Sequence, residues 1–221
     1  MSITHDPHAA QPVLTLGPAP SDARLALILV HGRGASAEDI LGLGAELQLP
    51  DVACLAPQAA GHTWYPYSFL SPIPQNEPGI TSGLGVIARL IEELGREGVP
   101  PARIGILGFS QGACLSLEFA ARNARRYAGV FGLSGGLIGP PATPRTYGGS
   151  LDDTPVFLGC SDVDGHIPLE RVHESADVFR RLGAKVDERI YPRMGHTVNS
   201  DELEAVRGML SATDQPRTRV R

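Results

Sequence analysis

The chain has 221 residues, with an apolar fraction of 42%, a charged fraction of 19%, 26 glycines and 19 prolines. This balance excludes a disordered or collagen-like chain, because there are enough apolar side chains to bury a core. The formal net charge of −5 argues against a basic face that could neutralise phosphates, so no nucleic-acid partner is expected.

The two ends of the chain, residues 1–12 and 212–221, are predicted to be mobile, and the second of them is basic. The first residues contain neither a basic start nor an apolar run, so no secretory signal is expected there. The longest aliphatic run, Leu25–Val30, is too short to span a bilayer. We therefore expect a cytoplasmic protein with no membrane span.

Between these ends, short apolar runs alternate with amphipathic segments. Runs that are apolar throughout are typical of inner parallel strands covered on both faces. Five such runs occupy residues 25–30, 52–56, 104–109, 128–133 and 155–160. Residues 185–191 mix polar and apolar side chains, which suits a strand nearer the sheet edge, and residues 13–16 are a candidate outermost strand.

Helices are predicted between the strands from apolar spacing and capping residues. Ser36 and Asp39 form a capping-box pattern, and Pro168 suits a first helical position. The predicted helices cover residues 36–48, 80–98, 111–124, 169–179 and 200–210. This alternation predicts a single α/β domain over residues 13–211 with a doubly wound, mostly parallel sheet. The long loops at 57–79 and 134–153 are too short to form a separate lid domain.

Three cysteines, Cys54, Cys114 and Cys160, lie far apart in apolar stretches. An odd number at this spacing fits neither a disulfide framework nor the paired ligands of a zinc site. They are predicted to be free, buried thiols in a reducing compartment, and Cys114 is predicted to be a core residue.

The pattern G-x-S-x-G occurs twice, around Ser110 and around Ser134. A nucleophile elbow requires a strand that runs into a sharp turn and then a helix. Ser110 has a predicted strand before it and a predicted helix after it. Ser134 is followed by a proline-rich stretch that cannot begin a helix, so Ser110 is the candidate nucleophile and Ser134 is expected near the floor of the substrate pocket.

A glycine turn, His31–Gly34, follows the first inner strand. Together with Ala37 it resembles a dinucleotide fingerprint, but that fingerprint requires an acidic residue about 20 positions on, where Gln58 stands. The H-G-x-G pattern is also typical of the oxyanion loop of α/β-hydrolases. On this interpretation the backbone N–H groups of Arg33 and Gln111 form the oxyanion hole, and the side chain of Arg33 is left free.

A serine hydroxyl near neutral pH needs a base, and the base needs a carboxylate to orient it. In hydrolases of this kind the order along the chain is Ser, acid, His, which leaves His166 and His196 as candidates for the base. His196 is favoured because it follows a late strand and precedes the last helix.

Asp162 and Asp164 both follow the strand that ends at residue 160, and physical reasoning alone does not choose between them. Their spacing is not that of a calcium loop, because position 12 of such a loop would be His173 instead of Glu.

Aromatic residues cluster in the loop at 57–79 and are candidates for the wall of a substrate pocket. The alternative is that these rings only cover the edge of the sheet. The candidates are Trp64, Tyr65, Tyr67 and Phe69.

Taken together, these motifs resemble the phospholipase/carboxylesterase family of α/β-hydrolases, which includes small bacterial carboxylesterases and acyl-protein thioesterases. The likeness extends from about Leu25 to Leu210 and rests on the order of four motifs: His31–Gly34, Gly108–Gly112, Asp164–Pro168 and Gly195–His196. The acid of that family lies in Asp-x-x-Val-Pro, which maps onto Asp164–Pro168. The resemblance therefore favours Asp164 over Asp162.

Three departures from the thioesterases favour a bacterial-type carboxylesterase: Arg33 in the oxyanion loop, Ala113 after the elbow, and Trp64–Tyr67 without a following acid. The predicted activity is cleavage of small-molecule esters with short to medium acyl chains, through an acyl-enzyme on Ser110. Neither a metal nor an organic cofactor is expected. An acyl thioesterase or lysophospholipase with the same triad is the alternative, and a nucleotide-binding oxidoreductase is a distant one. The oligomeric state stays open, with a homodimer among the options.

Overall fold

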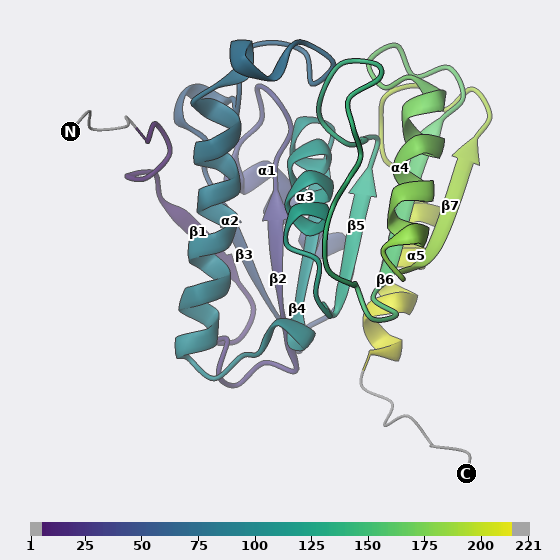
Figure 1. Cartoon of the computed structure of the whole chain (residues 1–221). Helices are drawn as coiled ribbons and strands as arrows, with labels where there is room; N and C mark the ends of the chain where they lie inside the picture. The colour runs from purple at the N-terminus through teal and green to yellow at the C-terminus, as the bar shows by residue number, and fades with distance from the viewer. Residues whose placement is uncertain (1–5, 214–221) are drawn as a thin grey trace.

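A sheet of parallel strands with one antiparallel edge strand forms the centre of the computed structural model, which describes residues 6–213 (Figure 1). Its strands are β1 (Val13–Leu16), β2 (Leu25–Val30), β3 (Val52–Pro57), β4 (Ile104–Phe109), β5 (Gly129–Leu133), β6 (Pro155–Ser161) and β7 (Lys185–Tyr191). They lie in the order β1-β3-β2-β4-β5-β6-β7, and only β1 runs antiparallel to its neighbour. The predicted doubly wound, mostly parallel α/β fold is confirmed.

The inner strands are apolar throughout because each of them contributes to two cores. Leu25, Leu27 and Leu29 of β2 belong to the cluster on one face of the sheet. The alternate residues Ala26, Ile28 and Val30 belong to the cluster on the other face. Successive side chains of a strand point to opposite faces, so a strand covered on both sides has no position for a polar side chain.

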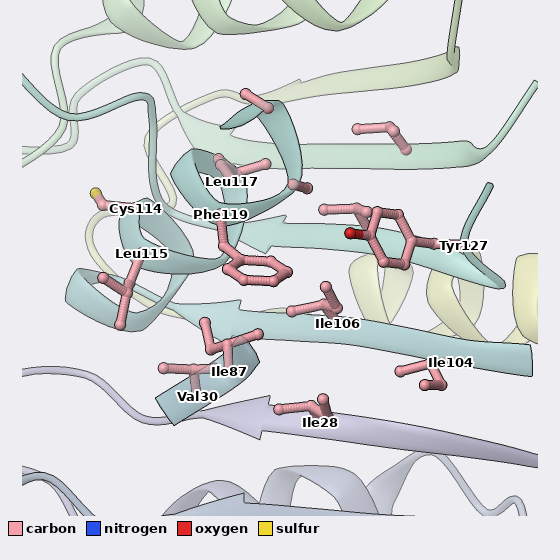
Figure 2. Packing of buried hydrophobic residues seen from close by; sticks show 14 of the residues in the cluster. Ile28, Val30, Ile87, Ile104, Ile106, Cys114, Leu115, Leu117, Phe119 and Tyr127 are labelled. Atoms are coloured by element: carbon pink, nitrogen blue, oxygen red, sulfur yellow. The ribbon is translucent and has the colours of Figure 1, made fainter. Parts of the chain in front are cut away.

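Helices cover both faces of the sheet (Figure 1). One face carries α2 (Gly79–Arg96), α3 (Gln111–Arg122) and α4 (Leu169–Arg181), and the other carries α1 (Ala37–Glu46) and α5 (Ser200–Ala212). Figure 2 shows the ring of Phe119 of α3 next to Ile106 of β4, and both belong to the same buried apolar cluster. The predicted capping box at Ser36 is present.

The carboxyl ends of the parallel strands share one edge of the sheet, where the loop at 57–79 lies (Figure 1). The loop at 134–153 begins at this edge and crosses to the opposite one, where β6 starts. The loop at 57–79 contains only short 3₁₀ turns, at Ala60–His62 and Ile73–Asn76. No separate lid domain is present within residues 6–213. The edge is therefore covered by loops alone.

The N-terminal residues that the structure describes are packed, which corrects the prediction of a mobile end for residues 6–12. His8 is 4% exposed, and its ring bonds the carbonyl of Trp64 at 3.0 Å and the N–H of Ala60 at 3.0 Å. Asp6 forms an ion pair with Arg89 of α2 at 2.9 Å. The segment is fixed by polar contacts, which leave no apolar pattern in the sequence. Residues 1–5 lie outside the described part of the chain.

At the other end α5 continues to Ala212, two residues further than predicted, and Thr213 donates a hydrogen bond to the carbonyl of Ala128 at 3.3 Å. Of the predicted basic tail, residues 214–221 lie outside the described residues. Within the described range, none of the helices has the length and apolar character needed to cross a membrane.

The three cysteines are unpaired and buried, as predicted. Burial raises the pKa of Cys54 to about 11 and the pKa values of Cys114 and Cys160 to about 12, so all three are neutral thiols at physiological pH.

The connection from β4 to α3 is a sharp turn at Ser110. Ser110 has φ 55° and ψ −119°, a conformation that is costly for any residue other than glycine. Gly108 and Gly112 flank it, and each packs directly against backbone: a Cβ on Gly112 would collide with the carbonyl oxygens of Val30 and His31. The glycines are needed for close approach of backbone, because α3 begins against the end of β2.

Replacing Gly112 by Ala should therefore destabilise the protein by more than about 3 kcal/mol or abolish folding, since the obstructing atoms are backbone and cannot rotate away. Gly42→Ala is the matched control. No heavy atom lies within 4 Å of its would-be Cβ, and in an exposed stretch of α1 the substitution should stabilise by about 1 kcal/mol. Urea unfolding of both variants gives the comparison, and a Gly112→Ala protein as stable as wild type would disprove the packing argument.

Glu202 in the first turn of α5 is fully buried, and its Oε1 has no hydrogen-bond partner among the described residues. Burial raises its pKa to about 7, although the N–H of Asn199 acts in the opposite direction. The folded state therefore holds a proton that the unfolded chain releases near pH 4.5, so the stability it contributes is complete at low pH and lost as the pH rises toward 7.

Relative to Glu202→Gln, the wild-type free energy of unfolding should fall by about 2–3 kcal/mol between pH 5 and pH 8. The difference between the two proteins isolates Glu202, because every other titrating group is shared. Parallel stability curves for the two proteins over this range would contradict the assignment.

Candidate active site

Three side chains from three different strand ends form one hydrogen-bonded chain. Ser110 follows β4, Asp164 follows β6, and His196 lies between β7 and α5. His196 Nε2 is 2.8 Å from Ser110 Oγ, and its Nδ1 is 2.7 Å from Asp164 Oδ2. Parallel strands bring these positions together because their carboxyl ends meet at the same edge of the sheet.

The carboxyl group of Asp164 is fully shielded from solvent and fully hydrogen-bonded. Burial alone would raise its pKa, but the hydrogen bond with His196 and the N–H groups of His166 and Ile167 outweigh burial, and the pKa lies below its usual value. The two N–H groups reach Oδ1 at 2.8 Å and 3.1 Å. Asp164 is therefore an ionised partner that fixes the orientation of the imidazole.

Asp162, the other candidate acid, has a different partner. Its Oδ1 accepts the backbone N–H of Arg193 at 2.7 Å, and the neighbouring Ser161 accepts the N–H of Gly195 at 3.0 Å. Both side chains hold the loop that carries His196. Asp162 therefore holds the loop of His196 in place but is not part of the hydrogen-bonded chain from Ser110 to Asp164.

His166, the other candidate base, lies beside His196 with a ring-centroid separation of 4.7 Å. Phe109 approaches the His196 ring at 5.1 Å. His166 lines the cleft but forms no hydrogen bond with Ser110 among the described contacts. The structure therefore brings His196, and not His166, onto the hydroxyl of Ser110.

Two backbone N–H groups near Ser110 have no acceptor within residues 6–213, those of Arg33 and Gln111. His31 sets the direction of the first, because its ring bonds the carbonyl of Gly32 at 2.7 Å. In a trans peptide the carbonyl and the following N–H point in opposite directions, so the N–H of Arg33 is turned away from His31. Two such unpaired donors could stabilise a developing negative charge on oxygen.

His31 is a functional support that sequence reasoning missed. It is fully buried, and burial lowers its pKa, so the ring is neutral and its Nε2 accepts the N–H of Ala59 at 3.1 Å. Its position at the first residue of the H-G-x-G turn was the available signal.

The side chain of Gln111 has a second role that sequence reasoning missed. Its Oε1 accepts the N–H of Trp64 at 2.9 Å, and its Nε2 donates to the carbonyl of Tyr65 at 2.8 Å. The residue after the nucleophile position therefore ties the aromatic loop to the start of α3.

The side chain of Arg33 is not free, which corrects the expectation from the sequence. Its Nη1 donates to Thr63 Oγ1 at 3.1 Å and to the carbonyl of Pro66 at 2.8 Å, and its Nη2 donates to the carbonyl of Tyr67 at 2.6 Å. The turn and the loop lie next to each other at the sheet edge, so the long side chain reaches carbonyls that would otherwise have no partner.

A cleft of about 510 Å³ opens above this array. Tyr65, Tyr67 and Phe69 line it, as the aromatic cluster in the sequence indicated. The remaining lining residues are Arg33, Pro66, Ser68, Ser110, Gln111, Cys114, His166, Ile167 and His196.

Two predicted pocket residues do not line the cleft. Trp64 is fully buried and donates its indole N–H to the carbonyl of His31 at 2.9 Å, so it supports the glycine turn from behind. Ser134 is also fully buried, and its hydroxyl lies 3.4 Å from the carbonyl of Thr197, beneath the loop of His196. The sequence places both residues near the cleft but does not indicate that their side chains are turned away from it.

No group of three or more His, Cys, Asp or Glu side chains within residues 6–213 is placed to hold a metal ion.

Comparison with known proteins agrees with this arrangement. The sequence profile of the family described as Phospholipase/Carboxylesterase matches residues 18–214. Among solved structures, the phospholipase/carboxylesterase from Dyadobacter fermentans is 39% identical and superposes with a TM-score of 0.88, covering 91% of this chain and 97% of that one.

Two curated relatives are each named acyl-protein thioesterase 1. The Yarrowia lipolytica protein is 27% identical over 208 residues, which cover 86% of this chain and 92% of the relative. The Gibberella zeae protein is 30% identical over 142 residues, a match that spans 62% of this chain and 59% of the relative's length. Because the family profile covers nearly the whole described chain, and the fold agrees over 91% of the chain, the chain belongs to the phospholipase/carboxylesterase family of α/β-hydrolases.

Proposed function

We propose that this chain is a serine carboxylesterase that cleaves short to medium acyl esters through an acyl-enzyme on Ser110. The observation that carries the proposal is the unbroken hydrogen-bonded chain from Ser110 through His196 to Asp164. Family membership agrees with this assignment.

In the first half of the reaction, Ser110 Oγ attacks the ester carbonyl while His196 Nε2 takes its proton. Asp164 keeps the Nδ1 proton on the far side of the ring and stabilises the imidazolium that forms. His196 then returns the proton to the leaving alcohol. The acyl group remains bound to Ser110 as an ester.

The carbonyl oxygen becomes negatively charged in each tetrahedral intermediate. The N–H groups of Arg33 and Gln111 are placed to stabilise this charge, and one such donor typically contributes about 10²–10³ in rate. Water, activated by His196, releases the acyl group in the second half of the reaction. This chemistry consumes neither a metal ion nor an organic cofactor.

The chain length of the substrate is proposed from the cleft. Loops form most of its walls, and Tyr67, which lines it, is 56% exposed, so the cleft is accessible from solvent. An open cleft without a separate lid suits acyl chains of short to medium length. A thioester substrate is the second candidate, because two relatives are acyl-protein thioesterases and the same three residues would serve.

The oxidoreductase alternative is not supported. Gln58, at the position where a ribose-binding acid would stand, accepts the N–H of Ala37 with its side chain at 2.9 Å. One of the donors at the start of α1 is therefore already bound to protein. The three unpaired thiols fit a reducing compartment, and on that basis we propose a cytoplasmic location.

Ser110→Ala should lower kcat for p-nitrophenyl esters by about 10³-fold or more, since the nucleophile is removed and only binding and the oxyanion hole remain. A panel of acyl chains of increasing length, assayed on both proteins, gives the measurement and the length preference. Intact-mass analysis after a fluorophosphonate probe should show an adduct on wild type only. Activity retained in the variant would refute the proposal.

The choice of base and acid is tested with neighbouring pairs. His196→Ala should lose activity as severely as Ser110→Ala, while His166→Ala should retain most of it. Asp164→Asn should lower kcat by about 10⁴-fold because the tautomer of His196 is no longer fixed. Asp162→Asn should have a much smaller effect, as it alters only a loop contact. The reverse order within either pair would move the assignment to the other residue.

A further inference from the structure

The guanidinium of Arg33 lines the cleft and is held in one position, although its charge has no counter-ion. All three of its side-chain hydrogen bonds go to neutral oxygens, those of Thr63, Pro66 and Tyr67. Its Cζ lies 5.9 Å from the centroid of the Tyr65 ring. A guanidinium stays protonated at every physiological pH, so the cleft carries a fixed positive charge.

Several other arginines of the described chain form ion pairs with carboxylates, although Arg103 and Arg126, like Arg33, bond neutral oxygens. Arg24, Arg89 and Arg189 form ion pairs with Asp51, Asp6 and Asp187 at 2.6–2.9 Å. Among the described residues, none of the Asp or Glu side chains forms such a pair with Arg33, and none lines the cleft.

The carboxylate of Asp164 belongs to the hydrogen-bonded chain with His196 and is shielded from solvent, so it is not a counter-ion of Arg33. The other titratable ring facing the cleft beside His196 is that of His166, which adds no negative charge in either protonation state. The chain as a whole has a net charge of −5, so this positive cleft is not a consequence of the overall composition.

Arg33 also has donors to spare. A guanidinium carries five N–H groups, and the three bonds to loop oxygens leave the Nε–H and one Nη2–H without a protein acceptor in the described chain. Charge-assisted hydrogen bonds from guanidinium to carboxylate are roughly twice as strong as neutral ones.

We propose that the cleft selects esters that bear a carboxylate, and that the side chain of Arg33 is the residue that recognises it. This inference rests on the proposed esterase activity. The same residue then serves twice: its backbone N–H faces the reacting oxygen, and its side chain binds a charged group elsewhere on the substrate. The carboxylate belongs either to the acyl chain or to the leaving alcohol.

The competing interpretation is that Arg33 only fastens the loop at 63–67. Both interpretations predict that a substitution at Arg33 lowers overall activity, because the loop and the oxyanion turn would be disturbed. The informative quantity is therefore the ratio of kcat/KM for an anionic ester to that for its neutral isostere, measured on one protein. A general loss of activity cancels in this ratio.

Two matched pairs distinguish the source of the carboxylate. Monoethyl succinate against ethyl succinamate tests the acyl side, and 4-carboxyphenyl butyrate against 4-carbamoylphenyl butyrate tests the leaving group. For wild type at low ionic strength, the ratio for at least one pair should be about tenfold in favour of the anion, and it should fall in 0.5 M NaCl because salt screens the charge.

In Arg33→Met the ratio should fall to about one or below, and Arg33→Lys should retain part of the preference because it retains the charge. Arg96→Met is the matched control: it removes the same charge from an exposed position at the end of α2 and should leave the ratio unchanged. If Arg33→Met does not fold, Arg33→Lys and the salt dependence of wild type still test the proposal.

A wild-type ratio near one for both pairs, or a preference that persists in Arg33→Met, would overturn the inference while leaving the esterase assignment intact. Failure of wild type to hydrolyse any of the four esters, or hydrolysis that persists in Ser110→Ala, would instead remove the proposed function on which it rests.

Discussion

The first turn of α3 lies directly against the end of β2, and this contact determines where the remaining groups of the site can lie. Only a residue without a side chain at Gly112 allows the backbone to come so close to the carbonyls of Val30 and His31. The same approach places the N–H of Gln111 beside the glycine turn that carries the N–H of Arg33. This close approach is why we propose that the two N–H groups, from distant parts of the chain, act together as one oxyanion hole.

Support for the cleft comes from the side chains of the same two residues. Gln111 and Arg33 are the two proposed oxyanion donors, and each also extends a side chain to backbone groups of residues 64–67. The wall that would bind substrate is therefore coupled mechanically to the groups that would stabilise the transition state. A shift of the loop would displace the proposed oxyanion donors, because the side chains of Arg33 and Gln111 connect the two.

The strands and helices could be predicted from the sequence because parallel strands buried on both faces leave uninterrupted apolar runs, and helices leave caps and stripes. Ser110 could be chosen over Ser134 because a nucleophile elbow requires a strand before the serine and a helix after it. The role of His31 could not be predicted, since a side chain that bonds backbone groups leaves no periodic pattern in the sequence. Trp64 and Tyr65 are equivalent by composition, and only the path of the loop decides which ring faces the cleft.

Asp162 and Asp164 illustrate the same limit at the scale of one loop. Both are acidic, both follow β6, and their carboxylates differ only in the backbone and ring groups that reach them. Chain order cannot separate two positions that are two residues apart. The Asp-x-x-Val-Pro pattern of the phospholipase/carboxylesterase family could separate them, because it fixes the distance between the acid and the following proline, Pro168.

The packing of His8 has a consequence for the order in which the protein is assembled during synthesis. Its partners Ala60, Trp64 and Ser82 lie 52, 56 and 74 residues further along the chain. Because Ser82 lies in α2, these contacts can be completed only after α2 has been translated. The support that His8 gives to the aromatic loop at Trp64 therefore depends on residues that are synthesised much later than His8 itself.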